Sequence, residues 1–80
     1  MSDDGLTAEQ IKMAKAALGL SNPDVSQATG LNRNTIQRAE SGGSVNRSTM
    51  ITLRRFFEGE GVQFIPENGG GAGVRLRDRK

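Results

Sequence analysis

The sequence contains no cysteine and no histidine among its 80 residues. Without cysteine it has no disulfide, no thiol nucleophile and no sulfur ligand for zinc. Without histidine it lacks the side chain most often used for acid–base catalysis near neutral pH. Catalysis would have to rest on paired carboxylates, and the lone acids Asp24 and Glu40 have structural explanations. We therefore expect no enzymatic activity, no metal and no cofactor.

Long apolar runs are also missing, since no stretch approaches the roughly 20 residues that span a bilayer. We expect a soluble, cytoplasmic protein without a membrane partner. A chain of 80 residues forms one domain with a marginal core. Association with a second copy is the obvious source of further burial.

The net charge is only +2, but the basic residues are unevenly distributed. Between Ile11 and Phe57 the acids are only Asp24 and Glu40, whereas the acids of the rest of the chain gather near the N-terminus and around Glu58 to Glu67. This imbalance fits either solvated helix faces or a polyanionic partner. The basic residues of the segment are Lys12, Lys15, Arg33, Arg38, Arg47, Arg54 and Arg55.

Helical spacing of apolar residues predicts two helices in the first 30 residues. The first opens with a capping box at Thr7 and ends near Gly19, because glycine is favoured just past a helix C-terminus. The second is short and ends at Gly30, which suits the positive φ of a tight turn. We expect Val25 and Ala28 to face the core.

Two more helices are predicted after the turn at Gly30. The third runs from Arg33 to about Ser41, with Ile36 and Ala39 on its inner face. The fourth starts near residues 46–48 and has an apolar stripe of Met50, Leu53, Phe56 and Phe57.

Beyond residue 60 the apolar pattern changes to the alternation of β-strands. Residues 62–65 and 74–77 predict a hairpin around a glycine-rich loop. We expect a flexible N-terminus (1–6), a helical domain (7–60) and a hairpin with a basic tail (61–80). The basic residues of that tail either touch a DNA backbone or only aid solubility, and they are Arg75, Arg77, Arg79 and Lys80. One face of the hairpin can pack on Phe56 and Phe57. A two-stranded hairpin is marginal alone, so its other face also needs cover, and a second copy of the chain can supply it. The residues through which we predict dimerisation are Val62, Phe64, Ile65, Val74 and Leu76.

Two short helices meeting at a glycine turn are typical of a helix-turn-helix, whose second helix enters the DNA major groove. Arginine can form two hydrogen bonds with guanine, and asparagine or glutamine can do so with adenine. The side chains on the outer face of the third helix that we expect to contact bases are Arg33, Asn34, Gln37 and Arg38. The residues that we expect to contact phosphates are Asn22, Thr35, Ser44, Asn46 and Arg47.

The segment from residue 7 to 58 resembles the Cro/C1-type (XRE) helix-turn-helix family of small regulators. The matching residues are Leu18, Gly19, Leu20, Ser21, Val25, Gly30, Leu31, Arg33, Thr35, Ile36, Arg38, Glu40 and Gly42. The resemblance implies a mainly α fold of four helices, which the hairpin completes. It also implies a phosphate contact at Asn22, base contacts at Arg33, Asn34 and Arg38, and a structural pair of Lys15 with Glu40. Ser26, Thr29, Asn22 and Ala39 depart from the family pattern and predict a lightly packed core.

We expect a homodimeric transcriptional regulator that acts as a repressor, binds a palindromic operator in double-stranded DNA and has no small-molecule effector. The alternative is an antitoxin or antiactivator-type module that masks a protein partner. A free hydrophobic hairpin face would favour this alternative. The polar residues on the outer face of the third helix favour DNA.

Overall fold

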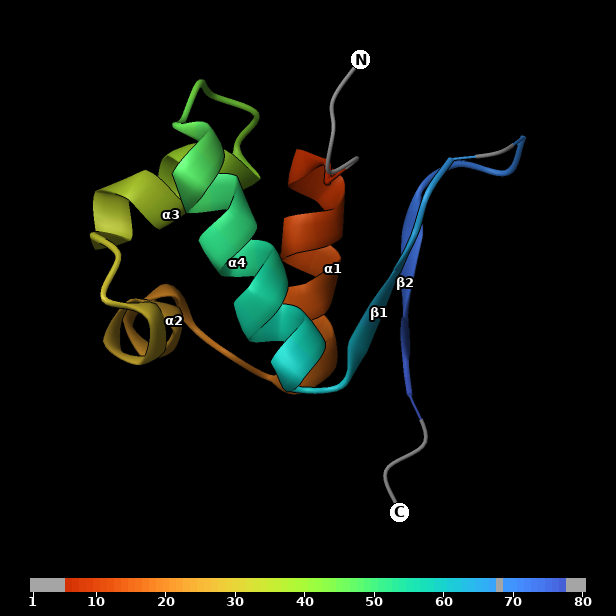
Figure 1. Cartoon of the computed structure of the whole chain (residues 1–80), viewed down its shortest axis with the longest axis horizontal. Coiled ribbons are helices and arrows are strands. Elements are labelled where there is room, and N and C mark those ends of the chain that lie inside the picture. The colour runs from red at the N-terminus through yellow and green to blue at the C-terminus, as the bar shows by residue number, and fades with distance from the viewer. Residues whose placement is uncertain (1–5, 68, 78–80) are drawn as a thin grey trace.

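The computed structural model describes residues 6–67 and 69–77. Within these residues the chain is mainly helical, with four helices followed by a two-stranded antiparallel hairpin (Figure 1). This confirms the predicted combination of helices with a C-terminal hairpin. The predictions for residues 1–5, Arg79 and Lys80 lie outside the described residues. The elements are α1 (Ala8–Leu18), α2 (Asn22–Thr29), α3 (Arg33–Glu40), α4 (Arg47–Gly59), β1 (Val62–Ile65) and β2 (Gly73–Leu76).

Local sequence signals set the helix ends. Thr7 and Gln10 form a capping box at the start of α1, and Gly19 ends that helix with φ 69°. Ser21 and Asp24 form a second capping box on α2. The strand β2 begins and ends one residue earlier than predicted, at Gly73 and Leu76.

All four helices contribute to one core. Ile11, Val25, Ile36 and Leu53 are fully buried, and Phe57 lies among them. The prediction for Ala28 was wrong, because this residue lies on the exposed face of α2. Within the described part of the chain, no helix is long and apolar enough to cross a membrane.

The core also includes residues that sequence analysis assigned elsewhere. Leu6 was predicted to belong to a flexible terminus, yet its side chain is buried in the core. Val62 and Phe64 were predicted to form a dimer interface, and they too are buried, at 1% and 8% exposure. Both pack against the helices of their own chain, so they are not accessible to a second copy. The hairpin therefore completes the core that the helices begin.

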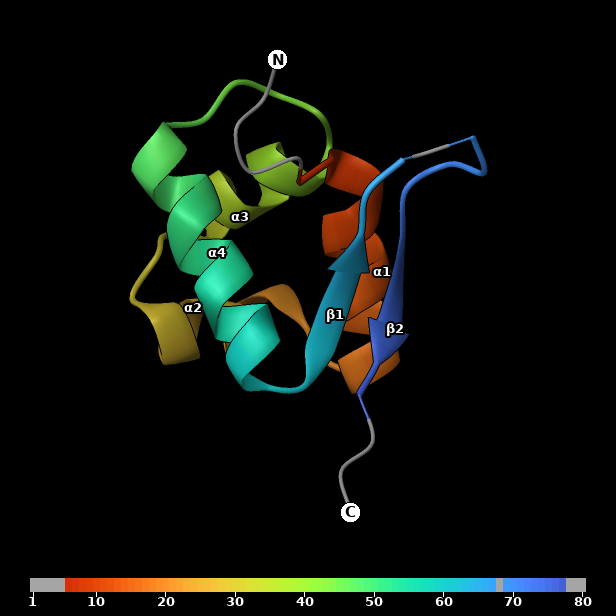
Figure 2. The same cartoon turned by 45° about the vertical axis from the view of Figure 1, so that its right-hand side comes forward.

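The hairpin pairs Val62 with Leu76 and Phe64 with Val74. Facing residues of an antiparallel pair lie on the same side of the sheet. Val62, Phe64 and Val74 meet the helices on this side, and Leu76 lies at its exposed end. Gln63 and Arg75 lie on the other side. The strand β1 lies beside α4, and β2 lies beside α1 (Figure 2). Both views place the hairpin on the opposite side of the molecule from α3.

Candidate nucleic-acid interface

The helix α3 has one buried face and one exposed face. Asn32 precedes it, and the Asn32 side chain accepts a hydrogen bond from the backbone N–H of Asn34 at 2.7 Å. Ile36 and Ala39 are buried in the core and fix the helix to the domain. The four side chains predicted to contact bases all lie on the exposed face: Arg33, Asn34, Gln37 and Arg38. The structure therefore brings this predicted set together.

The turn between α2 and α3 is held by side chains whose role the sequence analysis missed. The Ser26 hydroxyl donates to the Leu31 carbonyl at 2.6 Å. The Thr29 hydroxyl donates to the Val25 carbonyl at 2.7 Å and accepts from the Leu31 N–H at 3.1 Å. Gly30 adopts φ 80° between them. Ser26 and Thr29 depart from the family pattern, and their hydroxyls bind backbone groups to which an aliphatic side chain could not hydrogen-bond.

A polar network joins α1, α2 and α3. The Lys15 ammonium donates to Glu40 Oε1 at 2.6 Å and to Asn22 Oδ1. Asn22 Nδ2 donates to Glu40 Oε2 at 3.0 Å. The Lys15 and Glu40 side chains are only 15% and 16% exposed. The network fixes the C-terminal end of α3 against the first two helices and thereby orients its exposed face.

The charge state of Glu40 follows from this network. Burial by itself raises the pKa of the carboxyl group, since it removes solvent from the charged form. The hydrogen bonds from Lys15 and Asn22 and the charges of Lys15 and Lys12 together outweigh burial, and they hold the pKa of Glu40 below its ordinary value. Glu40 is therefore ionised at neutral pH.

The Asn22 side chain is bound within the chain, so the predicted phosphate contact at Asn22 stays a prediction about its backbone. Its amide oxygen and nitrogen bind Lys15 and Glu40 and do not point toward a partner outside the chain. The Ser21 N–H donates to the Asp24 carboxylate at 3.0 Å, which lowers the pKa of Asp24. A negative charge therefore already lies at the start of α2, and a phosphate contact there would depend on the Asn22 backbone N–H.

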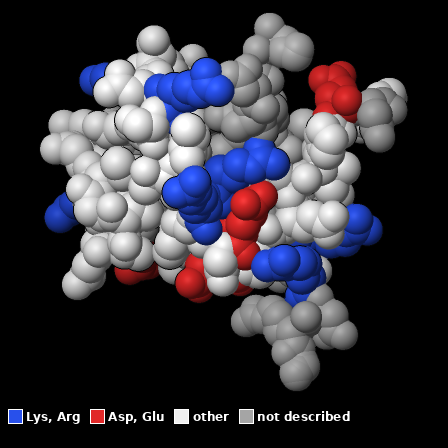
Figure 3. All heavy atoms as spheres, viewed as in Figure 1, with Lys and Arg blue, Asp and Glu red and all other residues white. Residues whose placement is uncertain are grey.

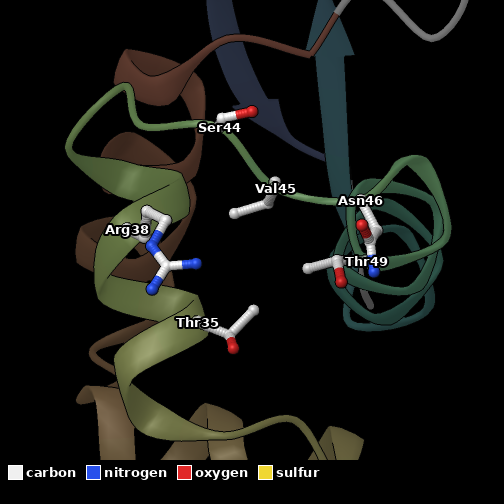
Figure 4. A pocket seen from close by; sticks show the side chains of 6 residues that line it. All are labelled: Thr35, Arg38, Ser44, Val45, Asn46 and Thr49. Carbon is white, nitrogen blue, oxygen red and sulfur yellow. The ribbon is translucent and has the colours of Figure 1, made fainter.

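A shallow groove of about 210 Å³ lies between α3 and the start of α4 (Figure 4). Arg38 and Thr35 project into it from α3, and Thr49 faces them from α4. Ser44, Val45 and Asn46 line the rest of it. Thr35, Ser44 and Asn46, three of the residues predicted to contact phosphates, thus surround Arg38. Thr49 was not predicted to belong to the site, and it is a buried polar residue in the first turn of α4.

The N-terminus of α4 continues this polar surface. Asn46 occupies the N-cap position, and its side chain makes no capping hydrogen bond. The exposed Arg47 begins the helix. Backbone N–H groups at a helix start and a nearby arginine are the groups that bind phosphate oxygens.

Other arginines bind the hairpin to α4. Arg54 donates to Glu58 at 3.1 Å and lies 5.7 Å from the centre of the Phe64 ring. The Arg77 guanidinium donates to the Glu58 carbonyl at 2.8 Å. Figure 3 shows basic side chains on this side of the molecule beside acidic ones. Charge here is locally compensated, whereas the described residues of α3 have Glu40 as their one acid, and it is paired with Lys15.

No model of a protein family matches the sequence, and no curated protein is similar to it.

Proposed function

We propose that this protein is a sequence-specific transcriptional regulator that binds double-stranded DNA through a Cro/C1-type helix-turn-helix formed by α2 and α3. The observation that supports it is the exposed face of α3, where four side chains able to bind base edges lie beside a polar groove. The network of Lys15, Asn22 and Glu40 holds this face in a fixed orientation.

The chemistry of the face suits the DNA major groove. An α-helix fits this groove, where each of the four kinds of base pair presents a different pattern of donors and acceptors. Arg33 and Arg38 supply donors for guanine O6 and N7, and Asn34 and Gln37 supply a donor and an acceptor for adenine. Thr35, Ser44, Asn46 and Arg47 bind the backbone next to these bases, with Thr35 also able to offer its methyl group to thymine.

The proposal includes a homodimer on a palindromic operator, with half-sites about 34 Å apart. The hairpin lies away from α3, so a second copy bound there would leave both α3 helices accessible. Leu76 is 45% exposed, and Ile65 and Val74 are partly exposed. Ile65 on the outward side and Leu76 at the end of β2 are the apolar groups that a second copy could bury, whereas Val74 packs against the core of its own chain.

The alternative function, masking of a protein partner, would need a free apolar face on the hairpin. The outward side chains at the centre of the two strands are Gln63 and Arg75, and both are exposed. This surface is polar, so we rank DNA binding first.

The test is selection of bound sites from a random duplex library with the full chain. We expect a palindromic consensus whose half-sites lie about one turn of DNA apart. Recovery of no preferred sequence, even at low salt, would contradict the proposal and favour the protein-masking alternative. A consensus without two-fold symmetry would contradict only the homodimer.

A further inference from the structure

Gly43 lies against the side chain of Arg38 just after α3. A Cβ atom at Gly43 would lie 2.5 Å from Arg38 Cγ, 3.4 Å from Arg38 Cδ and 3.2 Å from the Arg38 carbonyl oxygen. A carbon atom cannot approach Cγ this closely, so the aliphatic part of Arg38 occupies the space that any other residue at position 43 would need.

The backbone conformation of Gly43 does not itself require glycine. The preceding Gly42 has φ 87°, in the left-handed region, whereas the φ of Gly43 lies outside that region. The position therefore tolerates a Cβ as far as its own backbone is concerned. The steric conflict at this position is with Arg38.

The loop cannot easily move away to relieve such a conflict. The Gly43 N–H donates to the Arg38 carbonyl at 2.9 Å, and the Ser41 N–H donates to the carbonyls of Gln37 and Arg38. These bonds hold the loop on the last turn of α3. The Arg38 side chain is exposed and turns more easily than the backbone, so a Cβ at position 43 would rotate it.

We propose that Gly43 is a positioning residue for Arg38 in base recognition. Because it has no side chain, the stem of Arg38 lies across the loop and the guanidinium points into the groove between Thr35 and Thr49 (Figure 4). This direction determines which base edge Arg38 meets. The inference rests on the proposed DNA-binding function, and it adds a residue that touches no DNA itself.

The test compares Gly43→Ala, Arg38→Ala and the double variant on the duplex selected from the library. Fluorescence anisotropy of the full chain gives the Kd for each. We expect Gly43→Ala to weaken binding about 5-fold or more, in the range of one lost arginine–base contact. The double variant should bind like Arg38→Ala alone, because the clashing side chain is then absent. In both single variants, the preference for one base should relax at the same position of the operator.

A matched control is Gly70→Ala in the hairpin loop. Its φ is also outside the left-handed region, and a Cβ there meets nothing within 4 Å. This variant should bind like the wild type. The proposal would be overturned if Gly43→Ala bound like the wild type. It would also be overturned if the fold-change in Kd of the double variant equalled the product of the fold-changes of the two single variants.

Two measurements without DNA separate this inference from the proposed function. Nuclear Overhauser effects from the Arg38 side chain to the methyl groups of Thr35 and Thr49 should weaken in Gly43→Ala, and this holds even if no duplex binds. Unchanged effects would overturn the inference alone. All variants should melt cooperatively, and unfolding of Gly43→Ala would overturn it by showing a purely structural role.

Discussion

Arg38 lies in the groove and Arg47 is exposed at the N-terminus of α4, and we expect them to act differently on DNA. Arg33→Ala and Arg38→Ala should each weaken binding to the selected site by about 1–3 kcal/mol, because each removes a bidentate base contact. Binding to unrelated duplexes should change little. Arg47→Ala should weaken binding to all sequences and reduce the slope of log K against log salt by about one.

Titrations of each variant with the selected duplex and a scrambled one, over a series of salt concentrations, measure both effects. A uniform loss across sequences for all three variants would contradict the division into base and phosphate contacts. Arg55→Ala is the control, since Arg55 is exposed on α4 and outside the groove.

Glu40 links stability to pH. Its pKa is lowered in the folded state, so its contribution to stability is complete above the ordinary pKa and is lost as the pH falls through the lowered value. Glu40→Gln should therefore reduce the free energy of unfolding by about 1–3 kcal/mol at pH 7. The difference from the wild type should shrink as the pH falls below about 4.5.

Urea unfolding followed by circular dichroism at several pH values measures this difference. Glu60→Gln is a suitable control, because Glu60 is exposed at the end of α4. Unfolding midpoints that match the wild type at pH 7 would show that the pair with Lys15 adds nothing to stability.

At the scale of elements, the attachment of the hairpin to α1 depends on the buried Gln10. Its Nε2 donates to the carbonyls of Ile65 and Gly73, at 3.0 and 2.9 Å, and its Oε1 accepts from the Thr7 N–H at 3.0 Å. One side chain thus caps α1 and binds both strands. A substitution at Gln10 should loosen the hairpin without changing the exposed face of α3.

We expect Gln10→Glu to destabilise the protein by at least about 2 kcal/mol at pH 7, since a carboxylate would face two carbonyl oxygens without a donor. The pKa of this new carboxyl should be raised, so part of the loss should be recovered below about pH 4.3, where the group is neutral in both states. Hydrogen exchange of the amides of β1 and β2 reports the loosening. Gln27→Glu, at an exposed position of α2, is the control. Equal exchange in the two variants would contradict the role of Gln10.

At the scale of the whole molecule, the proposed dimer depends on what remains exposed after the core has formed. Leu76 and Met13 are the exposed large hydrophobic residues of the described chain, at 45% and 39%. Leu76 lies on the hairpin and Met13 on α1. They provide a matched pair for locating the interface.

Leu76→Glu should give a monomer in sedimentation equilibrium, because a buried charge without a partner opposes association. Binding to a two-half-site operator should fall about 100-fold or more, because the two copies no longer bind as one unit. Affinity for a single half-site should stay the same. Met13→Glu should remain dimeric. The reverse pattern would place the interface on α1, and two dimeric variants would exclude both positions.

The helix boundaries and the exposed face of α3 could be predicted because their causes are local. A capping residue, a glycine at the end of a helix and apolar residues at helical spacing depend on neighbours in sequence. Ala28 shows where this fails. Its spacing fits an inward position, but α2 has only two turns, and the packing of the neighbouring helices determines which of its faces is covered.

The sequence by itself determined the four helices, the hairpin and the outward position of Arg33, Asn34, Gln37 and Arg38, since short-range spacing decides these features. Only the tertiary structure decided the contacts between distant residues. One example is Gln10, which binds the carbonyls of Ile65 and Gly73. Another is Asn22, which joins the pair of Lys15 and Glu40. A third is the burial of Val62 and Phe64. Such contacts depend on how the helices cross and where the hairpin folds back, and spacing along the chain does not specify that geometry.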